Sequence, residues 1–192
     1  SVLLTRLKNS QYPIIFVDDA SDEPRISELL NDFVQHIPHS TIITHQTNLG
    51  FVAAANAGIE RAQGHIILLN SDTIPPRGDW ATRLLEPIFN DPIVASVTPF
   101  SNNAEILSIP NQNVRTDIDL ELVDKIDTQA EKLNKKHSLY QVPTGIGFCM
   151  AMNSAYIEKI GALDTSFGRG YGEEVDWCQK AQSANGKHIC LT

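Results

Sequence analysis

The sequence predicts a single α/β domain of the doubly wound type. Four short apolar runs, at 14–17, 41–44, 65–69 and 93–97, have the length of strands and the continuous Ile, Val and Leu content of a parallel sheet covered on both faces. Segments with helical spacing separate them, which gives the strand–helix alternation of this class. At 192 residues the chain fits one ordinary domain, so we expect 1–192 to fold as one unit.

The first three helices follow from capping residues and composition. Ser21 or Asp22 is placed to cap a helix whose apolar residues recur over 26–34. Residues 50–63 are rich in alanine and precede a glycine, which suits the end of a helix. Asp79 is placed to cap a third helix. These helices lie between the apolar runs, as a parallel sheet requires.

The second half of the chain is more varied. Residues 101–113 hold four asparagines and predict a polar loop. The sequence then predicts a charged surface helix or lid at 116–136 and an apolar run at 145–152. A short helix from Asn153 or Ser154 follows, then a glycine-rich turn at 167–172, a further helix at 173–183 and a last apolar run at 188–191.

Charge, cysteine content and the length of the apolar runs exclude several classes of function and location. The net charge of −8 argues against a nucleic-acid surface, so an anionic ligand must be held locally by a metal, backbone N–H groups or a few cations. Cys149, Cys178 and Cys190 have no short metal-binding spacing and apolar neighbours, so we expect buried, reduced thiols and a reducing compartment. With no apolar run of 18 residues and no signal peptide in the sequence, the expected location is the cytoplasm, either free or peripheral to the inner membrane face.

Two acidic turns follow predicted strands. Asp18 and Asp19 end the first strand, and Asn70-Ser71-Asp72 ends the third. Ligands of open α/β sheets bind outside the carboxyl ends of the strands, where a carboxylate can accept bonds from a base or ribose, or bind a cation together with a diphosphate. A helix cap at the first turn, an Asx turn at the second, and the acidic pair of a receiver domain are the alternatives.

Two further segments carry polar groups at predicted helices. Gly50 shapes the turn before the alanine-rich helix, and Asn56 within that helix needs a partner, either a ligand or a neighbouring loop. Glu173 and Glu174 open the helix after the glycine-rich turn, where the helix dipole stabilises negative charge. One of them could be a general base, or both could simply be favourable helix starts, and spacing does not choose between them.

In this order the four segments resemble family 2 glycosyltransferases of the GT-A fold, a Rossmann-like three-layer sandwich with a mostly parallel central sheet. The matching stretches are VDDAS at 17–21, NLGFVAAANAG at 48–58, NSD at 70–72 and EE at 173–174. The stretch 98–105 also looks like members associated with bacterial surface polysaccharides.

The resemblance implies roles for these residues. Asp18, Asp19, Gly50, Asn56, Asn70, Ser71 and Asp72 would bind the nucleotide, with Asp19 at the base, and Asp72 would coordinate Mn²⁺ or Mg²⁺ on the diphosphate. Glu174, with Glu173 as competitor, would be the catalytic base. The implied reaction is inverting transfer from a UDP- or dTDP-sugar to a hydroxyl of a glycan or lipid-linked acceptor, in polysaccharide or glycoconjugate biosynthesis.

The chain departs from the family pattern in four places. Asn70 stands where the family has an acid, and Glu174 where it has the shorter aspartate. Both ends are short of family elements, so we expect a fold truncated at both ends, an exposed sheet edge, and a partner or second copy that covers it. A non-catalytic nucleotide-sugar-binding module is the alternative. A receiver domain would need a lysine at the end of a later strand near the acidic pair, and this sequence has none well placed. A sugar nucleotidyltransferase would need a glycine-rich, basic phosphate loop near its start, which is also missing here.

Overall fold

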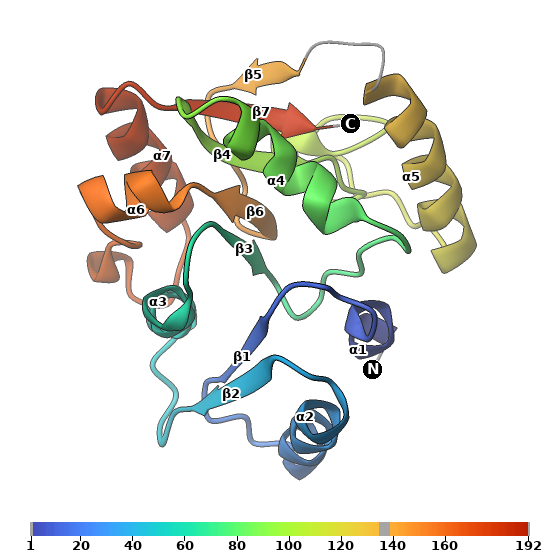
Figure 1. Cartoon of the computed structure of the whole chain (residues 1–192), viewed down its shortest axis with the longest axis vertical. Coiled ribbons are helices and arrows are strands. Elements are labelled where there is room, and N and C mark those ends of the chain that lie inside the picture. The colour runs from blue at the N-terminus through green and yellow to red at the C-terminus, as the bar shows by residue number, and fades with distance from the viewer. Residues whose placement is uncertain (1, 135–138, 192) are drawn as a thin grey trace.

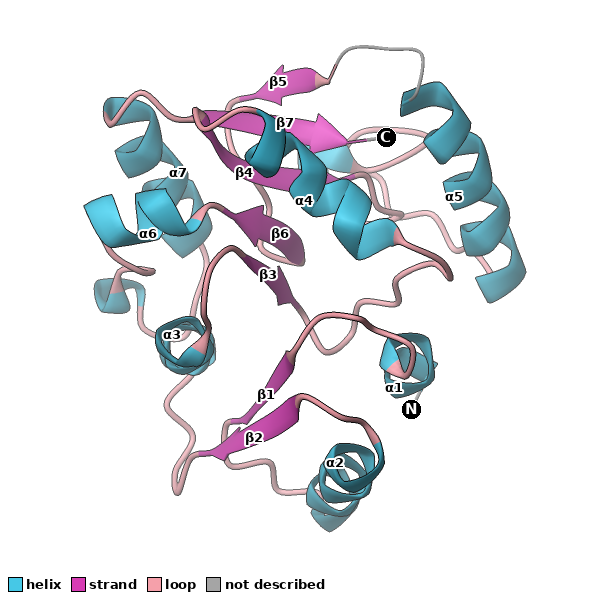
Figure 2. Cartoon of the chain, in the orientation of Figure 1, coloured by secondary structure: helices cyan, strands magenta, loops and turns pink. Residues whose placement is uncertain are grey.

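The computed structural model describes residues 2–134 and 139–191 and contains the predicted alternation of strands and helices (Figures 1 and 2). In chain order its elements are α1 (Val2–Leu7), β1 (Ile14–Asp18), α2 (Pro24–His36), β2 (Ser40–Thr44), α3 (Phe51–Arg61), β3 (Ile66–Leu69), α4 (Trp80–Asn90), β4 (Val94–Pro99), η1 (Glu105–Leu107), α5 (Leu120–Asn134), β5 (Tyr140–Val142), β6 (Cys149–Met152), α6 (Ser154–Ile160), η2 (Thr165–Phe167), α7 (Glu173–Ser183) and β7 (Lys187–Leu191).

The strands form two sheets. β1 and β2 pair in parallel, and the other strands form a five-stranded sheet in the order β3-β6-β4-β7-β5. Within it β4 and β7 are parallel, whereas β6 runs against β3 and β4, and β5 runs against β7. The larger sheet is therefore mixed, because β6 and β5 run antiparallel to their neighbours.

Helices cover both faces of the larger sheet, which gives three layers. Met150 and Met152 point from β6 into a cluster with α3, α6 and α7, where Trp177 is fully buried. Cys149 and Ala151, the alternate residues of β6, point into a second cluster with α4. This alternation follows from the period of two along a strand.

β1 and β3 each have one unpaired edge, and their apolar residues are only half-buried, in contrast to those of β4 and β6. α3 lies beside both sheets (Figure 1). It contacts β1, and its Val52 and Ile59 belong to the same apolar cluster as Ile66 and Leu68 of β3. α3 therefore packs against one strand of each sheet.

Several predicted details differ. Glu23 caps α2, rather than Ser21 or Asp22, because Pro24 fixes the first helical residue. Asp79 stands at the N-cap of α4 but its side chain makes no cap bond. The loop at 101–113 contains the short η1. The charged helix begins at Leu120, later than predicted, and its predicted last two residues, 135–136, lie outside the described residues.

Candidate functional site

Asp18 at the end of β1 anchors its own turn. Its side chain is buried and accepts bonds from the Ser21 N–H at 3.0 Å and the Ser27 hydroxyl at 3.3 Å. The Ser21 hydrogen bonds outweigh the opposing effect of burial and lower the pKa of Asp18. Asp18 thus ties β1 to the start of α2.

Asp19 holds the loop before α3. Its Oδ1 lies 2.7 Å from His45 Nδ1 and 2.9 Å from the Leu49 nitrogen, and its Oδ2 accepts the Gly50 N–H at 2.7 Å. Burial alone would raise the pKa of Asp19, but these hydrogen bonds outweigh it, so the pKa is lowered. His45 was not among the predicted site residues, because nothing in its local sequence distinguishes it.

The Gly50 turn lies against the glycine-rich loop at 168–172. Gly50 has φ +91°, and a Cβ there would be 3.1 Å from Arg169 Cα, which is too close for an ordinary contact. Only glycine combines this backbone angle with this approach. Through Gly50 the structure brings the Asp19 turn beside the loop that leads into Glu173.

The turn after β3 is connected to the start of α7 through the segment before β6. The Asn70 N–H and the Thr73 hydroxyl both donate to the Phe148 carbonyl, at 2.9 and 3.2 Å. Ser71 and Asp72 at the tip are exposed. A Cβ on Gly147, next to Phe148, would lie 3.9 Å from the Glu174 carboxylate. The Asn70–Asp72 turn is therefore connected to Glu174 through Phe148 and Gly147.

Glu173 and Glu174 open α7 and face different neighbours. Glu173 is 4% exposed and lies beside Gly170, whereas Glu174 lies beside Gly147. One carboxylate oxygen of each is buried without a hydrogen-bond partner. Burial, followed by the charge of Glu174, raises the pKa of Glu173. A buried carboxylate oxygen without a partner is uncommon, so both residues are candidates for exchanging a proton or a hydrogen bond with a ligand.

Asn56 has a partner within the protein. Its amide nitrogen donates to the Leu163 carbonyl at 2.8 Å, and its amide oxygen accepts the Leu163 N–H at 3.0 Å. Of the two partners expected from the sequence, the structure shows the neighbouring loop. Asn56 fixes α3 to the segment before the glycine-rich loop, which positions the site.

The donor set at the β3 turn suits a hard divalent cation. Asp72 offers an exposed carboxylate and Asn70 an amide oxygen, and Mg²⁺ is commonly held by one or two carboxylates together with substrate phosphates. Within residues 2–134 and 139–191 no group of three or more His, Cys, Asp or Glu side chains is arranged to hold a metal. The protein groups alone therefore fit a cation that is shared with a diphosphate.

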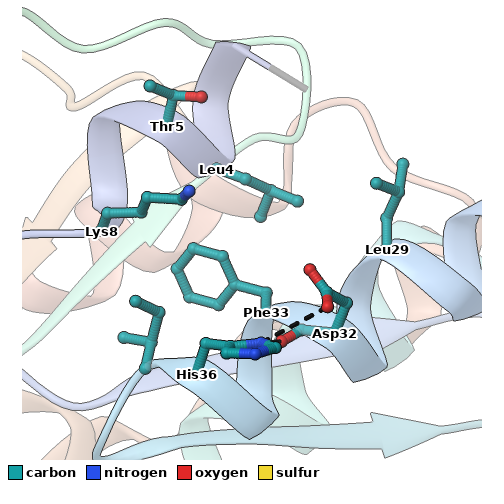
Figure 3. A pocket seen from close by; sticks show the side chains of 8 residues that line it. Leu4, Thr5, Lys8, Leu29, Asp32, Phe33 and His36 are labelled. Carbon is teal, nitrogen blue, oxygen red and sulfur yellow. Dashed lines mark hydrogen bonds and ion pairs between the residues drawn. The ribbon is translucent and has the colours of Figure 1, made fainter.

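A cavity of about 410 Å³ lies elsewhere, between α1 and α2 (Figure 3). Phe33 and Leu4 face it, with Asp32 and His36 at its rim, and no predicted site residue lines it. Among the described helices none is both long enough and apolar enough to cross a membrane.

Comparisons with known proteins agree with the fold. The family model described as Glycosyl transferase family 2 matches residues 2–161. A probable N-acetylgalactosaminyltransferase 7 of Caenorhabditis elegans is 25% identical over 97% of this chain and 33% of its own length. The chain thus spans about a third of that relative.

Two solved structures are similar. GalNAc-T7 with UDP, GalNAc and Mn²⁺ matches with a TM-score of 0.69 and 16% identity, over 93% of this chain and 36% of that one. The mannosyltransferase PcManGT from Pyrobaculum calidifontis, in complex with GDP-Man and Mn²⁺, matches with a TM-score of 0.67 and 17% identity, over 98% and 50%. These likenesses confirm the GT-A fold that the sequence predicted.

Proposed function

Because the chain belongs to glycosyl transferase family 2, we propose that its protein transfers a sugar from a nucleoside-diphosphate donor to a hydroxyl acceptor. The observation that carries the proposal is the continuous set of contacts around the site. Asp19 binds the Gly50 turn, Gly50 lies against the loop before Glu173, and Glu174 lies beside the segment that holds Asn70.

The similar proteins support a sugar nucleotide as donor. The solved relatives carry UDP or GDP-Man, both with Mn²⁺, and the curated relative is named as an N-acetylgalactosaminyltransferase. We propose UDP-linked sugars as the first donors to test, with dTDP-linked sugars next. A glycan or lipid-linked hydroxyl at the cytoplasmic membrane face is the proposed acceptor, in polysaccharide or glycoconjugate synthesis.

Each part of the site has a proposed role. The Asp19–Gly50 turn would contact the nucleoside, and Asn70, Ser71 and Asp72 would hold the cation and the diphosphate. The bound cation would neutralise the charge that the departing diphosphate gains.

Glu174 would accept the acceptor's hydroxyl proton. As the acceptor oxygen bonds to the anomeric carbon, the bond from that carbon to the phosphate oxygen breaks and its electron pair leaves with the diphosphate. Attack opposite the leaving group inverts the anomeric configuration, which NMR of the product can check.

Calorimetric titration with UDP, with and without Mn²⁺, tests the proposal. We expect Mn²⁺ to strengthen UDP binding, and Asp72→Ala to abolish that gain because it removes the carboxylate of the donor set. Asp32→Ala is the matched control, since Asp32 is an exposed aspartate on α2 at the rim of the separate cavity.

Two results would count against the proposal in different ways. An unchanged UDP affinity with and without Mn²⁺ in the unmodified protein contradicts the cation site. Tight donor binding with neither transfer nor donor hydrolysis, measured on the full-length protein, favours the non-catalytic binding module instead.

A further inference from the structure

The loop at 168–172 has an unusual backbone. Gly168, Gly170, Tyr171 and Gly172 all have positive φ, with values of 61°, 122°, 75° and 102°. Three of these residues are glycines, for which such angles are ordinary, but Tyr171 is not. A side chain in this region is sterically disfavoured, so a residue kept there is a candidate for function.

The side chain of Tyr171 has no packing role. It is 98% exposed, although a tyrosine usually contributes to stability by burying its ring. The backbone thus adopts a costly conformation that leaves an aromatic ring in solvent. Packing of the Tyr171 ring therefore does not explain this arrangement.

Tyr171 belongs to a loop that borders the site. Gly172, the next residue, caps α7 directly before Glu173, and Glu173 is 96% buried with one carboxylate oxygen unpaired beside Gly170. On the other side, Arg169 packs on the Gly50 turn that Asp19 holds. Tyr171 therefore lies in the loop between the proposed nucleoside contact and the proposed base.

We propose that Tyr171 is a sugar-binding residue, whose ring stacks on the C–H face of a pyranose at this site. This inference rests on the proposed function and deepens it. A flat, exposed ring matches the apolar C–H face of a sugar. The sugar is either the one on the donor or that of the acceptor.

The test compares Tyr171→Ala with Tyr171→Phe, and the exposed Tyr140 on β5, at the opposite edge of the sheet from β3, supplies the control Tyr140→Ala. Calorimetry in the presence of Mn²⁺ compares the affinity for UDP with that for UDP-GalNAc, and the affinity for GDP with that for GDP-mannose. Saturation-transfer NMR with methyl pyranosides, in the presence of UDP and Mn²⁺, measures binding of a separate sugar.

We expect Tyr171→Ala to leave UDP and GDP affinity unchanged and to weaken sugar binding by roughly three- to tenfold. If affinity falls for the nucleotide sugars, the ring binds the sugar of the donor. If it falls for the methyl pyranosides, the ring binds the sugar of the acceptor. Tyr171→Phe should retain binding, because the ring is kept. Tyr171→Gly should raise the melting temperature, since it relieves the backbone, and still lose sugar binding.

Three outcomes overturn this inference but not the proposed function. The first is that Tyr171→Ala leaves sugar affinity unchanged in both experiments, and the second is that Tyr171→Phe loses as much sugar affinity as Tyr171→Ala. The third is that, with short Ser/Thr peptides added as a third ligand, Tyr171→Ala weakens the binding of these peptides only. If the unmodified protein binds neither UDP nor GDP, the proposed function fails, and this inference fails with it.

Discussion

The carboxylates of the site differ in how fully they are hydrogen-bonded. Asp19 accepts bonds from His45 and from two backbone N–H groups, whereas Glu173 and Glu174 each keep one buried oxygen unpaired. A saturated carboxylate holds its surroundings in place, and an unsaturated one remains available to a ligand or a proton. We therefore propose that Asp19 shapes the site and that Glu173 or Glu174 reacts in it.

Glu174 is the proposed base, so its replacement should affect turnover and not donor binding. Glu174→Gln should lower kcat by about 10² to 10⁴, because an amide cannot accept the acceptor's proton, while UDP affinity is retained. Steady-state transfer assays on the full-length protein check this, with Glu173→Gln as the matched variant. A larger loss of kcat for Glu173→Gln would assign the base to Glu173.

Glu173 gives a prediction about stability. Burial raises its pKa, so the ionised form is disfavoured in the folded state. The favourable contribution of this carboxyl is complete below its unfolded pKa and is lost as the pH rises through the folded value. Glu173→Gln should therefore stabilise the protein by about 1 kcal/mol at pH 8, with no gain near pH 4. Urea unfolding at both pH values measures this, and a pH-independent effect would contradict it.

Sequence reasoning found most of these residues but not their partners. The order of the acidic segments led to Asp19, Asp72 and Glu174, because each follows or precedes a recognisable element. It could not show that Asp19 binds His45 and the Gly50 turn, since these pairs are set by how β1, β2 and α3 come together. It also left Tyr171 without a role, because φ and exposure are properties of the folded chain.

At the scale of elements, the position of α3 depends on the fit of its first turn. Gly50→Ala should destabilise the protein by about 1–3 kcal/mol and weaken UDP binding, because the added methyl lies against Arg169. Gly78→Ala is a matched control: its φ of +100° is similar, but its Cβ would meet nothing within 4 Å. Thermal unfolding and UDP titration measure both. Equal losses for the two variants would mean that the backbone angle alone matters.

The elements were largely predictable where the chain is strongly patterned. The apolar runs predicted β1 to β4 within a residue or two, and alanine content predicted α3. β5 was missed because Tyr140 to Val142 is short and exposed, so it has no strand-like pattern. The cap of α2 was misplaced because Pro24 sets the helix start. The reversal of β6 was also not visible, since an apolar run carries no direction.

For the whole molecule, the division into two sheets predicts uneven stability. The apolar residues of β1 and β2 are half-buried, whereas β6 and nearly all of β4 are fully buried. We therefore expect amides of β1 and β2 to exchange hydrogen at least tenfold faster than those of β4 and β6. Hydrogen exchange followed by mass spectrometry tests this, and uniform protection would contradict it. A partner or second copy that covers the edges should slow exchange in β1 and β3 selectively.

The fit between α3 and β1 has one more consequence. A Cβ on Gly58 would lie 3.4 Å from a methyl of Val17, so the helix and the strand approach with little space to spare. The same helix packs on β3 through Val52 and Ile59. The small residues of α3 therefore act as a spacer that sets the width of the gap between the strand that presents Asp19 and the strand that presents Asp72. A bulkier residue at 58 would push α3 away from β1 and so separate the proposed nucleoside contact from the proposed phosphate contact without altering the residues of either.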